Sequence, residues 1–399
     1  MKIGSNLSMA TLTNIESAAP VAAARALAPR LREHAAEADR LRTLPDATVR
    51  LLDEARLFDV LTPRELGGAG LGFDTAVLVA EELARGCASA GWVCAVLGGT
   101  AWAVAQMAPR AREEVFTGPS TRIALQLRLG GPPAERVADG LLLHGMRGRF
   151  CSGIDHADWI LAGVSAPRTE GADPEPHFAL LPRERTESLD DWHTSGLRGT
   201  GSRSFTTPAA PGLLVPEHRV LPLSALDPLN ASPYGRPGTA PYRMAHTAVG
   251  TVALAGVLLG TARAALDAHT ESAGRAPGPD ALDVPALTAT VDAARALLLA
   301  DLKALADSAT PGGSREERAR MRRDIAHAGT RCRAVVNAVY EASGSGVIYD
   351  DAPLQRIWRD ANAAAQHPTF DLRRWGPPHL ESQTEARSAD ITSPQETSA

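Results

Sequence analysis

The sequence has few cysteines and only a small net charge, and both features limit the classes of function that the protein can have. Four cysteines in 399 residues, none in a CxxC pair, argue against a disulfide framework and against a zinc site. There are 41 lysines and arginines and 46 aspartates and glutamates, so the net charge is −5. That balance gives no basic surface for nucleic acid or an anionic membrane. Neither is an expected partner.

Long uninterrupted apolar runs are also missing. The first residues, Met1 to Asn6, lack the apolar core of a signal peptide. The most apolar segment, 247–266, is interrupted by glycines, threonines and Arg263, so we expect a buried helix there and no membrane span. We therefore expect a soluble cytoplasmic protein from a reducing compartment.

The pattern along the chain predicts an α+β multidomain protein. Helical periodicity over residues 19–117 predicts an N-terminal helical domain, and short apolar runs between turn-forming residues predict a β domain over 118–225. Apolar residues spaced by three and four predict a C-terminal helical bundle over 226–380. Polar composition predicts disordered tails at 1–18 and 381–399. Glu81, Glu82 and the charged run 315–323 are expected on solvated helix faces.

Three segments in this order resemble the acyl-CoA dehydrogenase family. They are 61–72 (LTPRELGGAGLG), 195–202 (SGLRGTGS, followed by VPEHR at 215–219) and 356–360 (RIWRD). The resemblance covers residues 20 to 376. It implies an N-terminal helical domain, a middle β-sandwich or barrel domain and a C-terminal four-helix bundle, assembled as a homotetramer.

Further segments resemble one branch of that family, the two-component flavin monooxygenases. They are 149–159 (RFCSGIDHADW), similar to the branch's flavin-contacting strand, 362–367 (NAAAQH), similar to its flavin-side histidine motif, and 89–92 (SAGW). The resemblance implies an oxygenase that receives reduced FMN or FAD from a separate flavin reductase. It would use O2, through a flavin hydroperoxide, to hydroxylate or oxidise a small organic substrate such as a secondary-metabolite intermediate.

Two further absences fit the oxygenase branch. An acyl-CoA dehydrogenase needs a carboxylate base for the α-proton, yet residues 360–380 contain no glutamate and residues 240–266 contain neither glutamate nor aspartate. Asp360 and Asp371 are the remaining carboxylates in the first of these regions. The glycine-rich segment 67–72 has no βαβ context, so it does not predict a nicotinamide site.

The resemblance also assigns the site residues, several of which have a purely structural alternative. It implies catalytic roles for His367, Ser152 and His156, although His156 could instead be a buried histidine that holds a loop. Flavin contacts are implied for Phe150, Cys151, Ser152, Arg198, Arg275, Gly344, Gly346 and Arg359. Substrate contacts are implied for Trp92, Thr100, Gln126 and His246.

Two departures from the branch bear on the substrate. Thr100 stands where phenol-hydroxylating relatives carry a histidine, and a threonine hydroxyl is no base near neutral pH. The segment 126–133 (QLRLGGPP) replaces their serine and Pro-x-Gly turn. Phenol hydroxylation, N-oxygenation and oxidation of a larger intermediate therefore all stay open. So do two other functions, a flavin dehydrogenase or desaturase acting on a non-CoA or carrier-bound substrate, and a non-catalytic ligand-binding member of the fold.

Overall fold

Helices form the N-terminal part of the protein. The computed structural model describes residues 18–129, 131–272 and 282–392. The α-helices that precede the first strand are α2 (Ala19–Leu41), α3 (Asp46–Glu54), α4 (Phe73–Gly86), α5 (Ala88–Val104) and α6 (Pro109–Val115). Helix α5 is buried along nearly its whole length, which the apolar sequence from Ala88 onward predicts.

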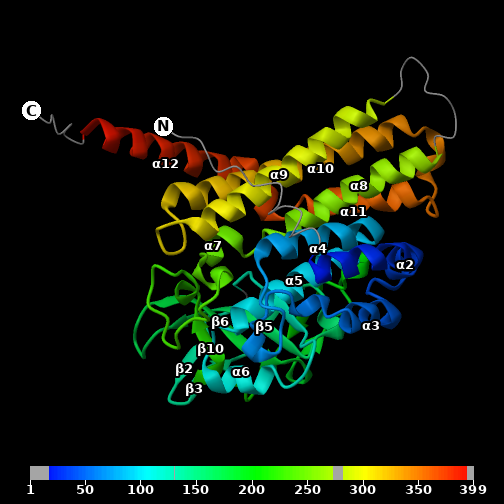
Figure 1. The fold of residues 1–399 in the computed structure, drawn as a ribbon. Coiled ribbons are helices and arrows are strands. Elements are labelled where there is room, and N and C mark those ends of the chain that lie inside the picture. Colours follow the sequence, from blue (N-terminus) through cyan, green and yellow to red (C-terminus); the bar gives the residue numbers. More distant parts are fainter. Residues whose placement is uncertain (1–17, 130, 273–281, 393–399) are drawn as a thin grey trace, which may run out of the picture.

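Three small sheets follow and form the lower part of the molecule in Figure 1. The four-stranded sheet has the order β1 (Ile123–Gln126), β5 (Trp159–Pro167), β6 (Pro174–Pro182) and β10 (Val220–Pro222), with β1 and β5 parallel. The second sheet has the order β2 (Glu135–Val137), β3 (Gly140–Leu143) and β9 (Leu213–Pro216). The third has the order β4 (Arg147–Cys151), β8 (Arg203–Thr206) and β7 (Glu187–Ser188).

Helices form most of the rest of the described chain, and the long ones among them make up the upper part of Figure 1. They are α7 (His246–Val249), α8 (Ala253–Ser272), α9 (Val284–Asp307), α10 (Arg315–Ala342), α11 (Pro353–Ala364) and α12 (Leu372–Thr392). Among the described residues, His246–Glu271 is the one helical stretch long and apolar enough to cross a membrane, and 83% of its apolar window is buried. The prediction of a buried helix at 247–266 is confirmed.

Helices α4 and α8 cross closely, and a buried ion-pair network accompanies the crossing. A Cβ on Gly260 would lie 2.0 Å from the Glu81 carbonyl oxygen, and one on Gly256 would lie 2.2 Å from the Val77 carbonyl oxygen. The Glu81 carboxylate is buried and accepts hydrogen bonds from Arg263 Nε at 2.5 Å and Arg295 Nε at 2.9 Å. The prediction that Glu81 faces solvent is wrong, because α8 and α9 both supply arginines to it.

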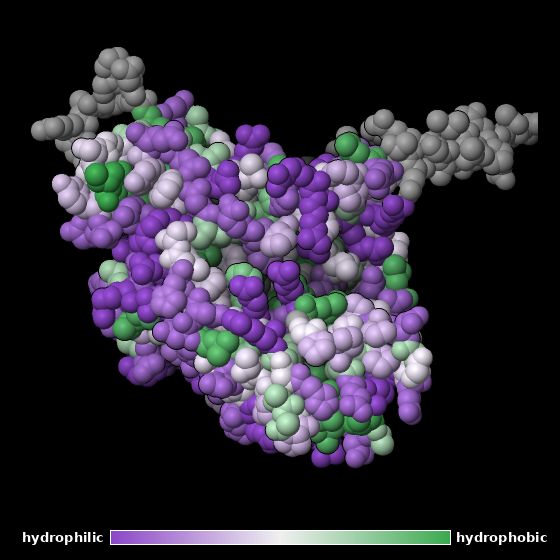
Figure 2. All heavy atoms as spheres, turned by 180° about the vertical axis from the view of Figure 1, so that it is seen from behind, coloured by the Kyte–Doolittle hydropathy of each residue, from purple (hydrophilic) through white to green (hydrophobic). Residues whose placement is uncertain are grey.

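Two other expectations also need correction. Helix α12 continues to Thr392, so the polar segment from residue 381 is helical over most of its length rather than a disordered tail. The charged run at 315–323 is not simply a solvated face, since residues 316–323 are half-buried except for the buried Met321. Arg320 and Arg323 there pair with the buried Asp301 and Asp324. Seen from behind, Figure 2 shows a hollow between the helical upper part and the lower part of the protein.

Candidate active site

The indole of Trp92 on α5 joins two of the predicted site residues. Its Nε1–H donates a hydrogen bond of 3.1 Å to Ser152 Oγ. The edge-to-face contact of the same indole with the His367 ring has a centroid separation of 5.8 Å. Ser152 follows β4 and His367 follows α11, so residues more than 200 positions apart meet at one side chain. The structure therefore brings Ser152, His367 and Trp92 together.

Ser152 is also the start of a chain of hydroxyl groups. Its Oγ lies 2.7 Å from Ser202 Oγ, and Ser202 Oγ lies 2.7 Å from Thr200 Oγ1. Thr200 Oγ1 donates to the Leu197 carbonyl oxygen at 2.8 Å. All three hydroxyl-bearing residues are buried.

The two ends of this chain fix the direction of every hydrogen bond in it. An indole N–H can only donate and a carbonyl can only accept, and each hydroxyl has a single hydrogen. Trp92 therefore donates to Ser152, Ser152 to Ser202, Ser202 to Thr200, and Thr200 to Leu197. The hydrogen of Ser152 points away from Trp92, and one lone pair of its Oγ is left to accept a bond from a ligand.

Backbone geometry holds this chain in place. Gly153 has φ +72°, and a Cβ there would lie 2.9 Å from Leu97 and 3.0 Å from Val93 on α5, so a glycine lets the Ser152 loop lie directly on that helix. Leu197 and Gly201 bracket the Thr200 turn with φ +50° and +52°. This segment lies within the SGLRGTGS motif, yet Thr200 and Ser202 are not among the residues predicted for the site.

His367 is a neutral histidine of defined tautomer. Its Nδ1 accepts the Thr369 N–H at 3.2 Å, so Nε2 carries the hydrogen. Burial, reinforced by the positive charge of Arg322, lowers the pKa of His367 to about 4. At neutral pH the imidazole ring is therefore uncharged, and it can donate a hydrogen bond through Nε2.

His246, a predicted substrate contact, lies in an aromatic cluster. Its ring stacks on Trp102 at 6.1 Å and 14°, and it meets the edge of Phe178 at 6.1 Å. Burial and Arg322 lower the pKa of His246 to about 4 as well. The three other predicted substrate contacts, Trp92, Thr100 and Gln126, are all buried. The Thr100 hydroxyl donates to the Val96 carbonyl at 2.7 Å, and the Gln126 Oε1 has no hydrogen-bond partner among the described residues.

His156, predicted as catalytic, has a structural environment. Its Nε2 lies 2.9 Å from the Leu44 carbonyl oxygen and 3.2 Å from Thr43 Oγ1. These contacts tie the loop after β4 to the loop between α2 and α3. Burial lowers the pKa of His156. The structure favours the structural interpretation, in which this histidine holds the loop that carries Ser152.

Arg198 and Arg359, predicted to contact flavin, share a carboxylate within this chain. Asp39 on α2 lies 3.6 Å from Arg198 Nη1 and 3.1 Å from Arg359 Nη2. Arg359 also donates to the Ser195 carbonyl at 2.8 Å. Within this chain both guanidiniums fasten α2 to the segment 195–200 and to α11, although the Arg198 Nε has no partner among the described residues.

The other predicted flavin contacts are dispersed. Phe150 is 56% exposed, has φ +61° and meets the edge of Trp192, while Cys151 beside it is fully buried. Gly344 and Gly346 are exposed, and a Cβ at either position would have no described heavy atom within 4 Å. Arg275 lies outside the described residues.

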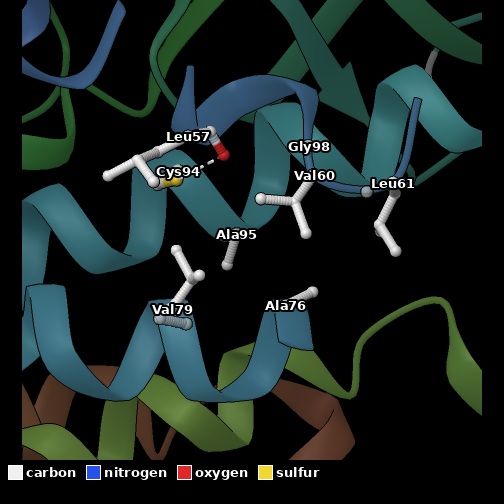
Figure 3. A pocket seen from close by; sticks show the side chains of 10 residues that line it. Leu57, Val60, Leu61, Ala76, Val79, Cys94, Ala95 and Gly98 are labelled. Atoms are coloured by element: carbon white, nitrogen blue, oxygen red, sulfur yellow. Dashed lines mark hydrogen bonds between the residues drawn. The ribbon is translucent and has the colours of Figure 1, made fainter. Parts of the chain in front are cut away.

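A small apolar cavity lies between α4, α5 and the segment 57–61, and the site residues described above do not line it. Leu57, Val60, Val79 and Ala95 point into it from η1 (Leu57–Asp59), the segment after it, α4 and α5 (Figure 3). The Cys94 thiol at its wall donates to the Leu57 carbonyl. The cavity is lined almost entirely by carbon and has no part in the contacts of Ser152 or His367.

Asp360 and Asp371, the two aspartates in the segment 360–380, are not placed to act as a catalytic base. The carboxylate of the buried Asp360 accepts the Leu197 N–H at 2.6 Å, and burial raises its pKa to about 6. Asp371 pairs with Arg373, both near the surface. Both carboxylates serve local structure, so neither is placed to abstract a proton from an acyl chain.

Comparison with known proteins identifies the family of the chain. The sequence profiles of the acyl-CoA dehydrogenase N-terminal and C-terminal domains match residues 16–116 and 252–372. The flavin-dependent monooxygenase oxygenase subunit HsaA of Mycobacterium tuberculosis is 32% identical over 383 residues, covering 92% of this chain and 95% of that protein. The chain belongs to the oxygenase components of the flavin-dependent monooxygenases. The predicted resemblance and fold class are confirmed.

Solved structures support the same assignment for this oxygenase. The 3-HSA hydroxylase from Rhodococcus sp. RHA1 superposes with a TM-score of 0.86 at 29% identity, covering 93% of this chain and 98% of the other. XiaF from Streptomyces sp., solved in complex with FADH2 and glycerol, superposes with a TM-score of 0.81 at 27% identity, covering 94% and 97%. The prediction of an oxygenase rather than a dehydrogenase is confirmed.

Proposed function

We propose that this oxygenase receives reduced flavin from a separate reductase and uses O2 to hydroxylate or oxidise a small organic substrate at the Trp92 site. The observation that carries the proposal is the meeting of Ser152 and His367 on one indole. Those two residues come from the two motifs that mark the flavin side of this branch. Reduced flavin supplies the electrons that activate O2, which no side chain in the site can supply.

The hydroxyl chain fits a reduced flavin. The N5 of a reduced flavin carries a hydrogen, and the remaining lone pair of Ser152 Oγ can accept it. An oxidised flavin has an acceptor at N5, which the Ser152 hydroxyl cannot satisfy while its hydrogen is committed to Ser202 at 2.7 Å. The chain of hydroxyl groups from Trp92 to Leu197 therefore favours binding of the reduced form of the flavin.

His367 can donate a hydrogen bond, and because it is neutral it is a poor source of protons. With its pKa lowered to about 4 it stays neutral at physiological pH, and its Nε2–H faces away from the Thr369 contact. We propose that it holds an oxygen atom during transfer, and that its low basicity limits the proton transfer that would release peroxide. Trp92 and Phe370 lie edge-to-face against its ring and would limit the access of water to it.

The finer assignments follow from the same resemblance. We propose FAD rather than FMN as the flavin, supported by the bound FADH2 in XiaF. The organic substrate, which we propose to be a secondary-metabolite intermediate, would lie toward His246, Trp102 and Gln126. We also propose a cytoplasmic homotetramer, supported by the exposure of Ile348 and Tyr349, which are 63% and 67% accessible in the single chain.

Peroxide release tests the site without knowledge of the substrate. Protein loaded with reduced FAD is mixed with O2, and hydrogen peroxide is followed over time. Ser152→Ala and His367→Gln should each release peroxide about tenfold faster than the parent, which is the scale of one lost hydrogen bond to a charged or reacting group. His193→Gln, at an exposed histidine of the β domain, is the matched control and should behave as the parent. Unchanged release by both site variants would refute the assignment.

A further inference from the structure

Arg322 on α10 is a half-buried cation without an acidic partner among the described residues. Its Nη1 donates to Thr251 Oγ1 at 3.2 Å, and its guanidinium lies 4.4 Å from the centre of the Trp375 ring. One hydrogen bond leaves most of the five N–H donors of the side chain unused within the described chain. Burial and the nearby Arg374 lower its pKa to about 10.

A second arginine, Arg374, adds to this charge. The Arg374 guanidinium lies 4.8 Å from the centre of the same Trp375 ring, whereas the adjacent Arg373 is paired with Asp371. Trp375 itself is fixed, because its Nε1–H donates to the Pro368 carbonyl at 2.8 Å. Two positive charges thus meet at one indole, and a half-buried charge such as that of Arg322 is normally compensated in folded proteins.

Arg322 is connected to the active site. Its partner Thr251 lies 2.7 Å from Thr369 Oγ1, and the Thr369 N–H donates to His367 Nδ1 at 3.2 Å. The charge of Arg322 also acts on the two half-buried histidines of the site, His246 and His367. The Arg322 guanidinium therefore lies close to the imidazole rings of His246 and His367, and so beside the active site.

We propose that Arg322, supported by Arg374, binds a carboxylate of the organic substrate, so that this oxygenase is specific for anionic substrates. The inference rests on the proposed function. A guanidinium presents a planar fork that matches a carboxylate in two parallel hydrogen bonds, and the stacked Trp375 holds that fork in one plane. His246, Trp102 and Phe178 supply the neutral, aromatic part of the same site. A bound carboxylate would supply the counter-charge that the described chain does not.

Binding of a matched ligand pair tests the proposal. The probes are 3-(4-hydroxyphenyl)propionate and its neutral amide, titrated calorimetrically into the purified full chain. The parent should bind the carboxylate at least about tenfold more tightly than the amide. Arg322→Gln should abolish that preference and leave the affinity for the amide within about twofold. Arg322→Lys, which keeps the charge and loses the fork, should keep part of it.

Two further variants keep the result interpretable. Arg374→Gln changes an exposed side chain, so it leaves folding intact and should weaken the carboxylate preference partially. Arg373→Gln removes the neighbouring, paired arginine and should preserve the preference. A parent that binds both probes equally, or neither, would overturn the proposal. So would an Arg322→Gln variant that loses both probes to the same extent, because that would indicate a purely structural arginine.

The phosphate of the flavin is the other source of an anion, and a second titration separates it. If Arg322→Gln weakens binding of FMN and not of riboflavin, the arginine serves the cofactor and the substrate proposal is wrong. Because these titrations need neither O2 nor turnover, their failure leaves the proposed oxygenase function standing. Conversely, if the peroxide-release experiment fails to support the proposed function, the preference for the carboxylate probe can still be measured.

Discussion

Replacing Ser202 by alanine removes the middle hydroxyl of the chain that runs from Trp92 to Leu197. In the parent, the hydrogen of Ser152 is committed to Ser202 at 2.7 Å. In Ser202→Ala that hydrogen is released, and Ser152 can turn it toward a flavin. The variant should therefore bind oxidised flavin more tightly than the parent does, while its affinity for reduced flavin changes little.

The structure sets the size of this effect. One neutral hydrogen bond contributes about 1 kcal/mol, which corresponds to about a fivefold gain in affinity for oxidised FAD. The variant also loses its bonds to Ser152 and Thr200, so its free energy of unfolding should fall by about 1 to 3 kcal/mol. Few deletions in a buried site improve binding, and this makes the sign of the change informative.

Anaerobic titration with reduced FAD and aerobic titration with oxidised FAD measure both constants. Ser152→Ala should show the opposite behaviour, with weaker binding of reduced FAD. Ser343→Ala, which deletes a hydroxyl bonded to the Val339 carbonyl outside the site, is the matched control for stability. If Ser202→Ala leaves the affinity for oxidised FAD unchanged, or weakens both forms equally, the direction assigned to the hydroxyl chain is wrong.

Three further predictions concern stability. Glu81→Gln leaves Arg263 without its buried carboxylate and should cost about 3 kcal/mol in urea unfolding, whereas Glu82→Gln, paired with the exposed Arg25, should cost less than about 1 kcal/mol. Gly260→Ala places a Cβ 2.0 Å from a carbonyl oxygen and should strongly destabilise the folded protein. Gly99→Ala, with open space at its Cβ, should stabilise α5 by up to about 1 kcal/mol. Equal effects of the two substitutions on the free energy of unfolding would contradict the close α4–α8 crossing. His246 and His367 have a folded pKa of about 4, below the unfolded value of about 6.5, so the unfolded chain binds more protons and stability should fall as the pH drops from 6.5 to 4. His246→Phe should reduce that fall, and a variant with an unchanged pH profile would argue against a buried neutral histidine.

The sequence predicts the parts of this protein that depend on local pattern. The apolar periodicity around Val291 and Leu298 indicates α9, and the short apolar run at Trp159 indicates β5. Ser152 and His367 are identifiable because each lies in a short motif. Their meeting at Trp92 is not predictable in the same way, since it depends on three segments that are distant in the chain.

Residues whose environment depends on tertiary contacts are the ones that the sequence predicts poorly. Glu81 looks like any solvated helix residue until α8 and α9 bring Arg263 and Arg295 to it. Arg322 lies in a charged run that is typical of an exposed helix face, yet α12 covers it with Trp375. Thr200 and Ser202 lie in a predicted motif, but their hydroxyls join Ser152 only through the left-handed turn at Leu197 and Gly201.

Rapid mixing of the protein and reduced FAD with oxygenated buffer tests the central claim most directly. The absorbance is followed over the flavin bands, with FMN in a parallel series and free flavin as the reference. An oxygenase site that accepts the N5–H at Ser152 and excludes water at Trp92 predicts a transient species that outlives its counterpart in free flavin. Reoxidation at the rate of free flavin, with both FAD and FMN, would contradict the account.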